Sequence, residues 1–585
     1  MRSPFYSDAE ARGLRTLTNG PDKPLPLDAT LSSLRRSLWG ISGVSLVINL
    51  LMLTGPIFML QIYDRVLVSG SVPTLVAIGT LALVLYCFYG VLEGLRGRVL
   101  YRIGQQVDAK LSAQAFSLST AIPIKLGAQG RRLRPVQDMD TLSRFISGHG
   151  PAAIYDIPWL PFYLAIVFLF HSLLGFVALA GALAICIMIA LNEVSCRGPS
   201  EKAAQVRGHR ESFVEESCRN AEVIQAMGMT NALSDLWNRE NTAFLDGQRI
   251  AADQSIFFGT SIKTTRFVLQ SAILAVGAWL AIEQEISAGV MIACSIMTAR
   301  ALAPVEQAVA HWRGFVAARQ SFRRLREMLR VQVEPDLDIA LPLPRKRFTI
   351  AQLSCGPAGT RQPVVRGVNM ELAAGEGLGI IGPSGSGKST LVRAMVGAAS
   401  ILNGDIRFDG AELGQWSSAE RRRFIGYLPQ VLQLFDGTIA QNIARFDPYA
   451  SSEAVIEAAT LADIHDMIVG LPNGYNTIVG IEGMTLSGGQ QQRIALARAL
   501  YGAPFFIVLD EPNSNLDTEG EVALAEAITA MRHRGSIVIL VAHRPRVIGT
   551  VDKVLCLKQG QVVASGPREQ VLRKTLVSVS ARASA

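Results

Sequence analysis

The chain has 585 residues, of which 49% are hydrophobic and only 18% charged, and its mean hydropathy is +0.29. These values exclude a disordered, collagen-like or coiled-coil protein and predict a membrane component. The formal net charge of +8 is typical of proteins that meet nucleic acid or a membrane surface, and the distribution of basic residues favours the membrane and no nucleic acid. Seven scattered cysteines without a C-x-x-C pair argue against a disulfide framework or zinc cluster and for a mainly cytoplasmic folded bulk.

Long apolar runs begin after a polar amino-terminal segment. Residues 1–37 contain four prolines and no short apolar core after a basic start, so we expect a cytoplasmic segment and not a cleaved signal peptide. A helix needs about 20 apolar residues to cross a membrane, and the candidate runs are 38–60, 73–92, 152–191, 267–282 and 287–305. The third run has room for two helices that turn near His171 and Ser172. Because buried core helices do not explain six such segments, residues 38–330 are predicted to form a six-helix transmembrane domain.

Basic residues are concentrated in two loops between these helices. Segment 95–151 holds nine lysines and arginines and segment 193–255 holds seven, whereas the three short connections together hold one, Arg65. Cytoplasmic loops carry such an excess, so both long loops and both termini are expected in the cytoplasm. The tips of the two loops, near 138–146 and 221–229, are candidates for contact with a cytoplasmic domain.

The sequence changes character after residue 330. Residues 331–347 are rich in proline and are expected to be a linker. Short β-rich runs alternate with helical segments over residues 348–575, as in an α/β domain with a largely parallel sheet. Residues 576–585 are expected to be a disordered tail. Three continuous apolar runs are typical of buried strands, namely 378–381, 505–509 and 537–541.

A glycine-rich segment directly follows the first of these strands. It fits the pattern G-x-x-x-x-G-K-[ST] at a strand-to-helix turn. Backbone N–H groups in this pattern surround nucleotide phosphates, while Lys388 would contact the β- and γ-phosphates and the Ser389 hydroxyl would bind Mg²⁺. The predicted binding residues are Gly382, Pro383, Ser384, Gly385, Ser386, Gly387, Lys388, Ser389 and Thr390.

Two acidic residues follow the second buried strand. Asp510 and Glu511 lie about 120 residues after the glycine-rich loop. Two acids after a strand are as often a solvated turn, but in this position they match the acidic strand end of a P-loop ATPase. Asp510 is therefore predicted to hold Mg²⁺ through water, and Glu511 is predicted to polarise the attacking water as the catalytic base.

A second helix N-terminus suited to anions lies before these acids. A serine and two glycines at 487–489 open a helix. Backbone N–H groups and the helix dipole at such a helix N-terminus favour negative charge. A single domain has no use for two such cradles on one γ-phosphate unless a second copy faces the first. The residues added to the predicted binding site are Ser487, Gly488, Gly489 and Gln490.

Two further polar residues follow strand-like runs. Gln430 ends the segment 427–430 and is suited to contact Mg²⁺ and the attacking water. His543 follows the third buried strand. A lone histidine at a strand end is more often a surface residue, so its assignment to catalysis depends on the motifs around it.

In order and spacing, these elements resemble those of an ATP-binding-cassette (ABC) ATPase: phosphate loop, glutamine loop, signature, acidic strand end and histidine loop. The resemblance covers residues 348–575 and implies ATP and Mg²⁺ as cofactors. It also implies that His543 contacts the γ-phosphate and that residues 487–489 complete a partner's site. The family often stacks adenine on an aromatic residue before the phosphate loop, but residues 353–357 contain none, so no adenine-stacking residue is assigned.

The membrane half narrows the resemblance, which there runs over residues 35–575. Four segments are similar to the permease/ATPase of bacterial type I secretion systems, namely 58–67, 156–161, 220–227 and 300–307. The resemblance implies ATP-driven export of a protein across the bacterial inner membrane by a homodimer. It further implies a periplasmic membrane-fusion adaptor and an outer-membrane channel as partners.

The length of the amino-terminal segment indicates which branch of this family the chain resembles more closely. The haemolysin-exporter branch carries a peptidase-like domain before the first span, whereas only 37 residues stand there in this chain. The resemblance is therefore closer to the branch that exports RTX-like proteases, lipases and related repeat-rich proteins. The expected localisation is the inner membrane, with the ATPase domain in the cytoplasm.

Two alternative functions stay open at this stage. The first is an exporter of lipids or small molecules with the same cassette. The second is a membrane-anchored ATPase or receptor without transport, against which the six spans and the full set of hydrolysis residues argue. Arg300 and Glu306 lie near the end of the last span and could face a translocation path. The alternative for Arg300 is that its side chain reaches the membrane surface. We favour the first interpretation.

Overall fold

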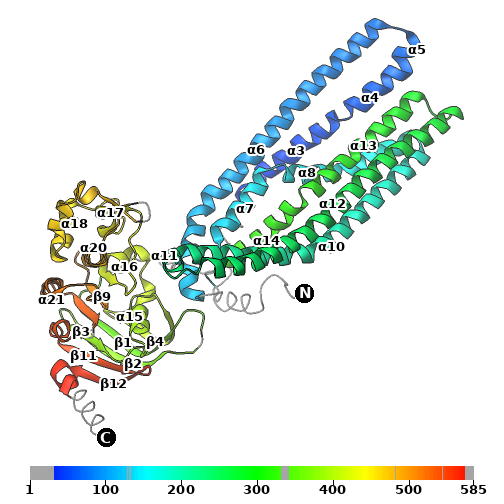
Figure 1. Cartoon of the computed structure of the whole chain (residues 1–585). Coiled ribbons are helices and arrows are strands. Elements are labelled where there is room, and N and C mark those ends of the chain that lie inside the picture. Colours follow the sequence, from blue (N-terminus) through cyan, green and yellow to red (C-terminus); the bar gives the residue numbers. More distant parts are fainter. Residues whose placement is uncertain are drawn as a thin grey trace. The chain divides into compact units, whose positions relative to one another are not determined.

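The computed structural model describes residues 32–127, 130, 133–330, 341–360, 362–480, 483–542 and 544–573. The chain forms two compact units. One contains the helices before residue 119 together with residues 134–330, and the other contains residues 119–133 and the chain after residue 330. Figure 1 shows long helices in the first unit and a mixed α/β domain in the second, which confirms the predicted fold class.

Six helical segments of the described residues are long and apolar enough to cross a membrane. The first segment is broken into α3 (Arg35–Leu51), α4 (Thr54–Gln61), a π-helical turn (Ile62–Val66) and α5 (Leu67–Ser69). The others contain α6 (Val72–Leu126), α8 (Gly150–Asp156) with α9 (Leu160–Phe170), α10 (Ser172–Arg219), α12 (Thr230–Ile282) and α13 (Ala288–Ala310). Shorter helices are α7 (Pro135–Ser147), α11 (Ala221–Ala226) and α14 (Trp312–Met328). The number of candidate spans confirms the prediction.

The break between α9 and α10 falls at the predicted turn. His171 has an extended backbone, with φ −161° and ψ 133°, and its side chain accepts a hydrogen bond from the backbone N–H of Leu173. Helices α6, α10 and α12 have 55, 48 and 53 residues. At about 1.5 Å per residue each is far longer than the ~30 Å hydrocarbon core. They therefore continue well beyond a bilayer.

A buried polar cluster joins three segments of the helical unit. The guanidinium of Arg96 in α6 contacts both carboxylate oxygens of Asp156 at 2.8 and 2.9 Å, and also Glu93 at 2.8 Å. Asn49 of α3 donates to the same Asp156 carboxylate, and its backbone carbonyl accepts a hydrogen bond from the Tyr163 hydroxyl at 2.7 Å. Because Arg96 is only 4% exposed, this cluster ties α3, α6 and the α8–α9 segment together inside the unit.

Two aspartates of the helical unit bind helices that are distant in sequence. Asp64, in the π-helical turn, accepts hydrogen bonds from the Ser287 hydroxyl at 2.5 Å and from the Gly289 N–H at 2.9 Å, at the start of α13. Asp138 of α7 is buried and bonded to Arg324 and Ser321 of α14. The predicted loop tip near 138 is thus packed within the helical unit, and it is the segment 119–133 that belongs to the unit of the α/β domain.

The α/β domain is built on two sheets. The larger sheet has the order β12-β11-β3-β10-β9-β6, in which β12 is antiparallel and the others are parallel. Its strands are β3 (Gly377–Ile381), β6 (Ile425–Leu428), β9 (Phe506–Asp510), β10 (Ile537–Val541), β11 (Lys553–Lys558) and β12 (Gln561–Pro567). Every residue of β9 and β10 is buried, as expected for strands covered on both faces.

The second sheet is antiparallel, with the order β2-β1-β4-β5. Its strands are β1 (Arg347–Gly356), β2 (Val365–Ala373), β4 (Ser400–Phe408) and β5 (Ala411–Glu412), and β7 (Gly437–Thr438) pairs separately with β8 (Ile478–Val479). Phe348 and Phe408 of this sheet pack on Phe506 of the larger one, with ring centroids 4.5 and 5.0 Å away. The helices are α15 (Lys388–Met395), α16 (Ser418–Phe424), α17 (Ile439–Ile443), α18 (Ser452–Leu461), α19 (His465–Val469), α20 (Gly488–Leu500), α21 (Thr518–His533) and α22 (Pro545–Ile548).

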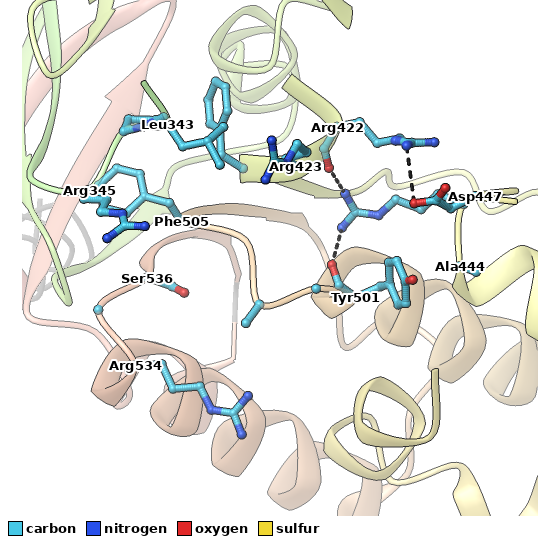
Figure 2. Close-up of a pocket in the computed structure, with 16 residues that line it drawn as sticks. Leu343, Arg345, Arg422, Arg423, Ala444, Asp447, Tyr501, Phe505, Arg534 and Ser536 are labelled. Atoms are coloured by element: carbon cyan, nitrogen blue, oxygen red, sulfur yellow. Dashed lines mark hydrogen bonds and ion pairs between the residues drawn. The ribbon is translucent and has the colours of Figure 1, made fainter. Parts of the chain in front are cut away.

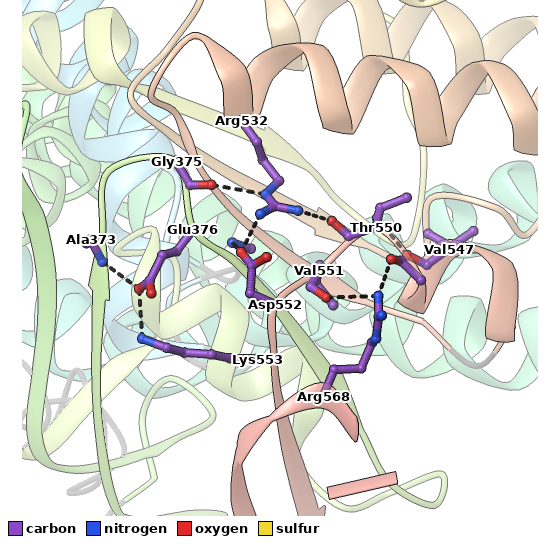
Figure 3. A network of polar contacts seen from close by, with 12 residues as sticks. Ala373, Gly375, Glu376, Arg532, Val547, Thr550, Val551, Asp552, Lys553 and Arg568 are labelled. Carbon is purple, nitrogen blue, oxygen red and sulfur yellow. Dashed lines mark hydrogen bonds and ion pairs between the residues drawn. The ribbon is translucent and has the colours of Figure 1, made fainter. Parts of the chain in front are cut away.

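A polar network fixes the amino ends of the strands in the larger sheet (Figure 3). The guanidinium of Arg532, from α21, donates to the carbonyl of Gly375 at 3.0 Å and is paired with Asp552. Asp552 also accepts a hydrogen bond from the Gly377 N–H at 3.0 Å. On the other side, Glu376 pairs with Lys553 at 2.7 Å. The network thereby sets the position of β3, whose opposite end carries the glycine-rich loop.

Candidate nucleotide site

The predicted phosphate loop, acidic residues and glutamine lie at one edge of the larger sheet. The neighbouring strands β3, β10, β9 and β6 are parallel, with Val541 opposite both Ile380 and Asp510, and with Leu428 opposite Leu509. Segments that follow these strands therefore leave the sheet at the same end. His543, predicted for this edge, lies outside the described residues. Gln430 is exposed two residues after β6.

Glycines are required at two places in the phosphate loop. Gly382 has φ +150°, and a Cβ there would lie 2.1 Å from the Leu557 carbonyl oxygen. Gly387, which precedes α15, has φ +99°, and its Cβ would lie 2.6 Å from the Val365 side chain. Any other residue would be strained in both backbone conformation and space. The loop can therefore bring its backbone N–H groups close to a bound anion.

The lysine of the loop is buried against the loop itself. Lys388 is 5% exposed, and its ammonium donates hydrogen bonds to the carbonyls of Gly382 at 2.8 Å and Pro383 at 3.0 Å. Burial lowers the pKa of Lys388, and the nearby carboxylates of Glu511 and Asp510 oppose this shift. The cation is thus placed between the loop and the two acidic residues.

Ser389 and Asp510 come together as the sequence predicts. The Ser389 hydroxyl donates to one carboxylate oxygen of Asp510 at 3.2 Å. The second oxygen of Asp510 is buried and has no hydrogen-bond partner among the described residues, and the same is true of the Ser386 hydroxyl. Burial raises the pKa of Asp510, an effect reduced by the hydrogen bond from Ser389. A buried carboxylate oxygen without a partner is costly, and a Mg²⁺ ion would satisfy it.

Glu511 has a backbone conformation that is rare for its residue type. Its φ is +53°, although its N–H still donates to the Val541 carbonyl at 3.1 Å. A non-glycine residue in this region costs about 1–3 kcal/mol and commonly marks a functional site. The turn ends β9 and directs the chain away from Asp510, so the two neighbouring carboxylates can serve different roles.

The predicted signature segment opens α20 with reciprocal caps. The Ser487 hydroxyl accepts from the Gln490 N–H at 3.3 Å, and the Gln490 side chain accepts from the Ser487 N–H at 3.0 Å. Gly489 lies next to Asn515, whose carbonyl oxygen would be 3.1 Å from a Cβ at that glycine. A pocket of about 340 Å³ is lined by Ser487, Gly489, Gln490 and the segment 515–517, and within the described chain none of its lining residues belongs to the phosphate loop. The structure thus separates the two predicted anion cradles within one domain.

One buried polar residue of the signature helix was not predicted from the sequence. Gln492 of α20 is 2% exposed. It donates to the Pro512 carbonyl and accepts from the Asn515 N–H at 3.0 Å. These bonds join the signature helix to the segment that follows Glu511. Since glutamine is common on exposed helix faces, its identity alone gave no signal.

Both halves of the chain match known protein families. Residues 365–514 match the sequence model of the ABC transporter family, and residues 39–302 match that of the ABC transporter transmembrane region. The chain is 50% identical over 548 residues, 94% of each chain, to "Type I secretion system ATP-binding protein PrsD" of Rhizobium meliloti. It is 29% identical to "Leukotoxin translocation ATP-binding protein LktB" of Mannheimia haemolytica, over 91% of this chain and 76% of that protein.

The fold is also found in a solved structure. A bacterial Atm1-family ABC exporter with ATP bound superimposes with a TM-score of 0.80, over 95% of this chain and 99% of that one, at 24% sequence identity. Fold and site thus define a membrane-anchored P-loop ATPase. The chain belongs to the ABC transporter family, among its type I secretion ATP-binding proteins.

Proposed function

We propose that this chain hydrolyses ATP to export a protein out of the cytoplasm, as the energising component of a type I secretion system. The observation that carries the proposal is a P-loop site with a paired Ser389 and Asp510 on a chain with six candidate membrane spans. The similarity to PrsD extends over both halves of the chain. This extent supports protein export over export of lipids or small molecules.

Each predicted site residue has a proposed role. Residues 382–390 bind the phosphates of ATP, Ser389, Gln430 and Asp510 hold Mg²⁺, and Glu511 is the catalytic base, while His543 contacts the γ-phosphate. When bound there, Mg²⁺ would supply positive charge opposite the phosphate oxygens. The buried Asp510 oxygen and Ser386 hydroxyl, which have no hydrogen-bond partner among the described residues, support binding of a cation and an anion at this edge of the sheet.

We further propose that the working unit is a homodimer with two ATP sites. Each site would take its phosphate loop from one chain and residues 487–490 from the other. The separation of the two cradles within one domain supports this arrangement. The proposed location is the bacterial inner membrane, with a periplasmic adaptor and an outer-membrane channel as partners and Arg300 and Glu306 on the translocation path. In the helical unit Glu306 forms an ion pair with Arg266 at 2.8 Å.

Deletion of the gene in its host tests the exported class. One or more polypeptides should disappear from the medium and return when the wild-type gene is supplied, but not when Lys388→Ala is supplied. Lipid composition of the outer membrane, measured on the same cells, should stay unchanged. An unaltered set of secreted proteins combined with altered lipids would instead establish the lipid-exporter alternative.

A further inference from the structure

A basic pocket lies within the ATPase domain at the sheet edge opposite the nucleotide site. It is lined by the connections that lead into β9 (501–505) and into β10 (534–536), by the chain before β1 (343–345), and by residues 422–424 and 444–447. Its volume is about 640 Å³, and small-molecule sites usually enclose about 300–1,000 Å³. Figure 2 shows arginines from separate segments around this hollow.

Positive charge dominates the lining. Among the residues that the structure describes, five arginines and a single carboxylate, that of Asp447, line the pocket. Asp447 pairs with Arg422 at 3.3 Å, and Arg534 pairs with Glu457, which lies outside the lining, at 2.6 Å. Arg345 and Arg423 are exposed and form no ion pair with any residue that the structure describes. At least two arginines are therefore available to an anion.

Arg445 adds to the lining a charge that is paired with no acid of the described chain. Its guanidinium donates to five backbone carbonyls, those of Arg422, Ile425, Arg498, Ala499 and Tyr501, at 2.7 to 3.3 Å. Carbonyl oxygens satisfy the donors but carry no net charge. Burial, reinforced by the neighbouring Arg498, lowers the pKa of Arg445 to about 10. At neutral pH the group therefore stays charged, and its field reaches the pocket.

The same pocket has an apolar wall. Phe424 is fully buried, and Phe505 and Leu343 line the pocket beside it. A wall of this kind next to arginines suits a ligand that has both anionic groups and a flat or apolar portion. Surface arginines that only aid solubility would not need to gather around a hollow between five separate segments.

We propose that this pocket binds a small molecule that carries several phosphate groups. Arginines bind phosphate oxygens through strong, charge-assisted hydrogen bonds, and a multiply charged group matches the excess of positive charge. The size of the hollow favours a small molecule over a peptide. The phosphate source is either an inorganic polyphosphate or a nucleotide, and the apolar wall would favour the nucleotide.

A binding experiment on the full-length chain tests the proposal. The chain is purified in neutral detergent with Lys388→Ala, which weakens the competing phosphate loop. Tripolyphosphate and GTP are then titrated in Mg²⁺-free buffer and followed by calorimetry. Both should bind, and the double variant Arg345→Glu/Arg423→Glu should weaken binding by about ten-fold or more, because two attractive charges become repulsive. The exposed Arg573 provides the control, since Arg573→Glu should leave the affinity unchanged.

The outcomes separate the possible ligands from non-specific attraction. Tighter binding of GTP than of tripolyphosphate identifies a nucleotide as the source, and equal binding identifies inorganic phosphate groups, both in support of the proposal. The proposal is overturned if neither ligand binds, if the pocket variant binds as well as its parent, or if Arg573→Glu weakens binding equally. It is also overturned if hexaglutamate binds more tightly than either phosphate ligand. None of these results depends on protein export, so failure of this proposal would not contradict the proposed function.

Discussion

At the residue scale, the nucleotide site is a set of buried polar groups whose partners are incomplete within the described chain. The sequence predicted Asp510 as a Mg²⁺ ligand because two acids follow an apolar strand, and the structure adds that one of its oxygens is buried without a hydrogen bond from any described residue. It also identified Lys388, whose ammonium is bonded to loop carbonyls. The sequence could not reveal which of these polar atoms are buried, because burial of an individual atom depends on residues far away in the chain.

Asp510→Asn should stabilise the chain in the absence of Mg²⁺ and nucleotide. Burial raises the pKa of Asp510 in the folded chain, so the folded chain favours the protonated carboxyl. This contribution to stability is fully present below the ordinary pKa of the side chain, about 4. It is lost as pH rises through the raised pKa of the folded chain. At pH 7 without Mg²⁺ the wild type carries this cost, and asparagine does not. The midpoint of thermal unfolding should therefore be a few degrees higher in the variant, and the difference should shrink as pH falls.

Asp517→Asn is the matched control for this experiment. The hydrogen bond from the Gly520 N–H lowers the pKa of Asp517, so loss of its charge should leave the midpoint unchanged or lower it. Addition of Mg²⁺ with ATP should raise the midpoint of the wild type more than that of Asp510→Asn. If Asp510→Asn had a lower unfolding midpoint than the wild type without Mg²⁺, the buried carboxylate of Asp510 would not destabilise the folded chain.

Glu511→Gln should retain ATP binding and lose turnover. The amide has nearly the same shape as the carboxylate but cannot polarise the attacking water, and loss of a general base commonly reduces the rate about 10²–10⁴-fold. ATP affinity and steady-state hydrolysis measured on the purified chain test this. The exposed Glu526 of α21 serves as a control, since Glu526→Gln should hydrolyse ATP at the wild-type rate. Undiminished hydrolysis by Glu511→Gln would remove Glu511 from the role of base.

At the element scale, apolar periodicity and length identified the spans and the buried strands, because a helix or strand exposed to lipid or covered on both faces is apolar throughout. The predicted strand 537–541 coincides with β10. Polar contacts between elements were missed. Arg96 counted only as one basic residue of a cytoplasmic loop, yet it is buried and paired with Asp156, 60 residues away. Single-sequence patterns do not report such pairs.

Arg96→Leu should destabilise the helical unit strongly. It would leave the Asp156 carboxylate buried without its partner, and removal of one member of a buried ion pair costs roughly 3–5 kcal/mol. Thermal unfolding of the chain in detergent should show a large drop in midpoint. The double variant Arg96→Leu/Asp156→Leu should recover part of the loss, because no lone charge is left behind.

The neighbouring Arg98 gives the control for this prediction. It lies on the same helix and is exposed, so Arg98→Leu should change the midpoint little. If Arg96→Leu and Arg98→Leu had equally small effects, the buried cluster would not hold α3, α6 and α8 together.

At the scale of the whole molecule, the order of the two units and the class of transporter could be predicted because the motifs occur in a fixed order along one chain. The assignment of the segment 119–133 to the unit of the ATPase domain was missed, because the sequence pattern placed the tip of the basic loop near 138–146 instead. The notable arrangement at this scale is the separation of the signature pocket from the phosphate loop. On the proposed dimer, each chain would supply two half-sites, and a twofold pair would complete both.

Mixed dimers test whether the sites are shared between chains. Lys388→Ala damages the phosphate loop, and Ser487→Arg removes the cap of α20 and fills its anion cradle, so dimers of either variant alone should be inactive. In a mixed dimer with shared sites, one site receives both damaged parts and the other receives the intact phosphate loop and the intact signature. Co-assembled and separately tagged chains should therefore regain some ATP hydrolysis.

A second mixed dimer, in which both substitutions are in one chain, should give the opposite result to the first. It thereby excludes the explanation that activity depends only on the number of intact parts. When Lys388→Ala and Ser487→Arg are placed in the same chain and that chain is paired with wild type, shared sites each contain one damaged part and the dimer should be inactive. Self-contained sites would leave the wild-type chain fully competent, so this dimer would hydrolyse ATP while the first mixture stayed inactive. The two mixtures, measured side by side on purified heterodimers, therefore distinguish shared from self-contained sites by a reversal of activity.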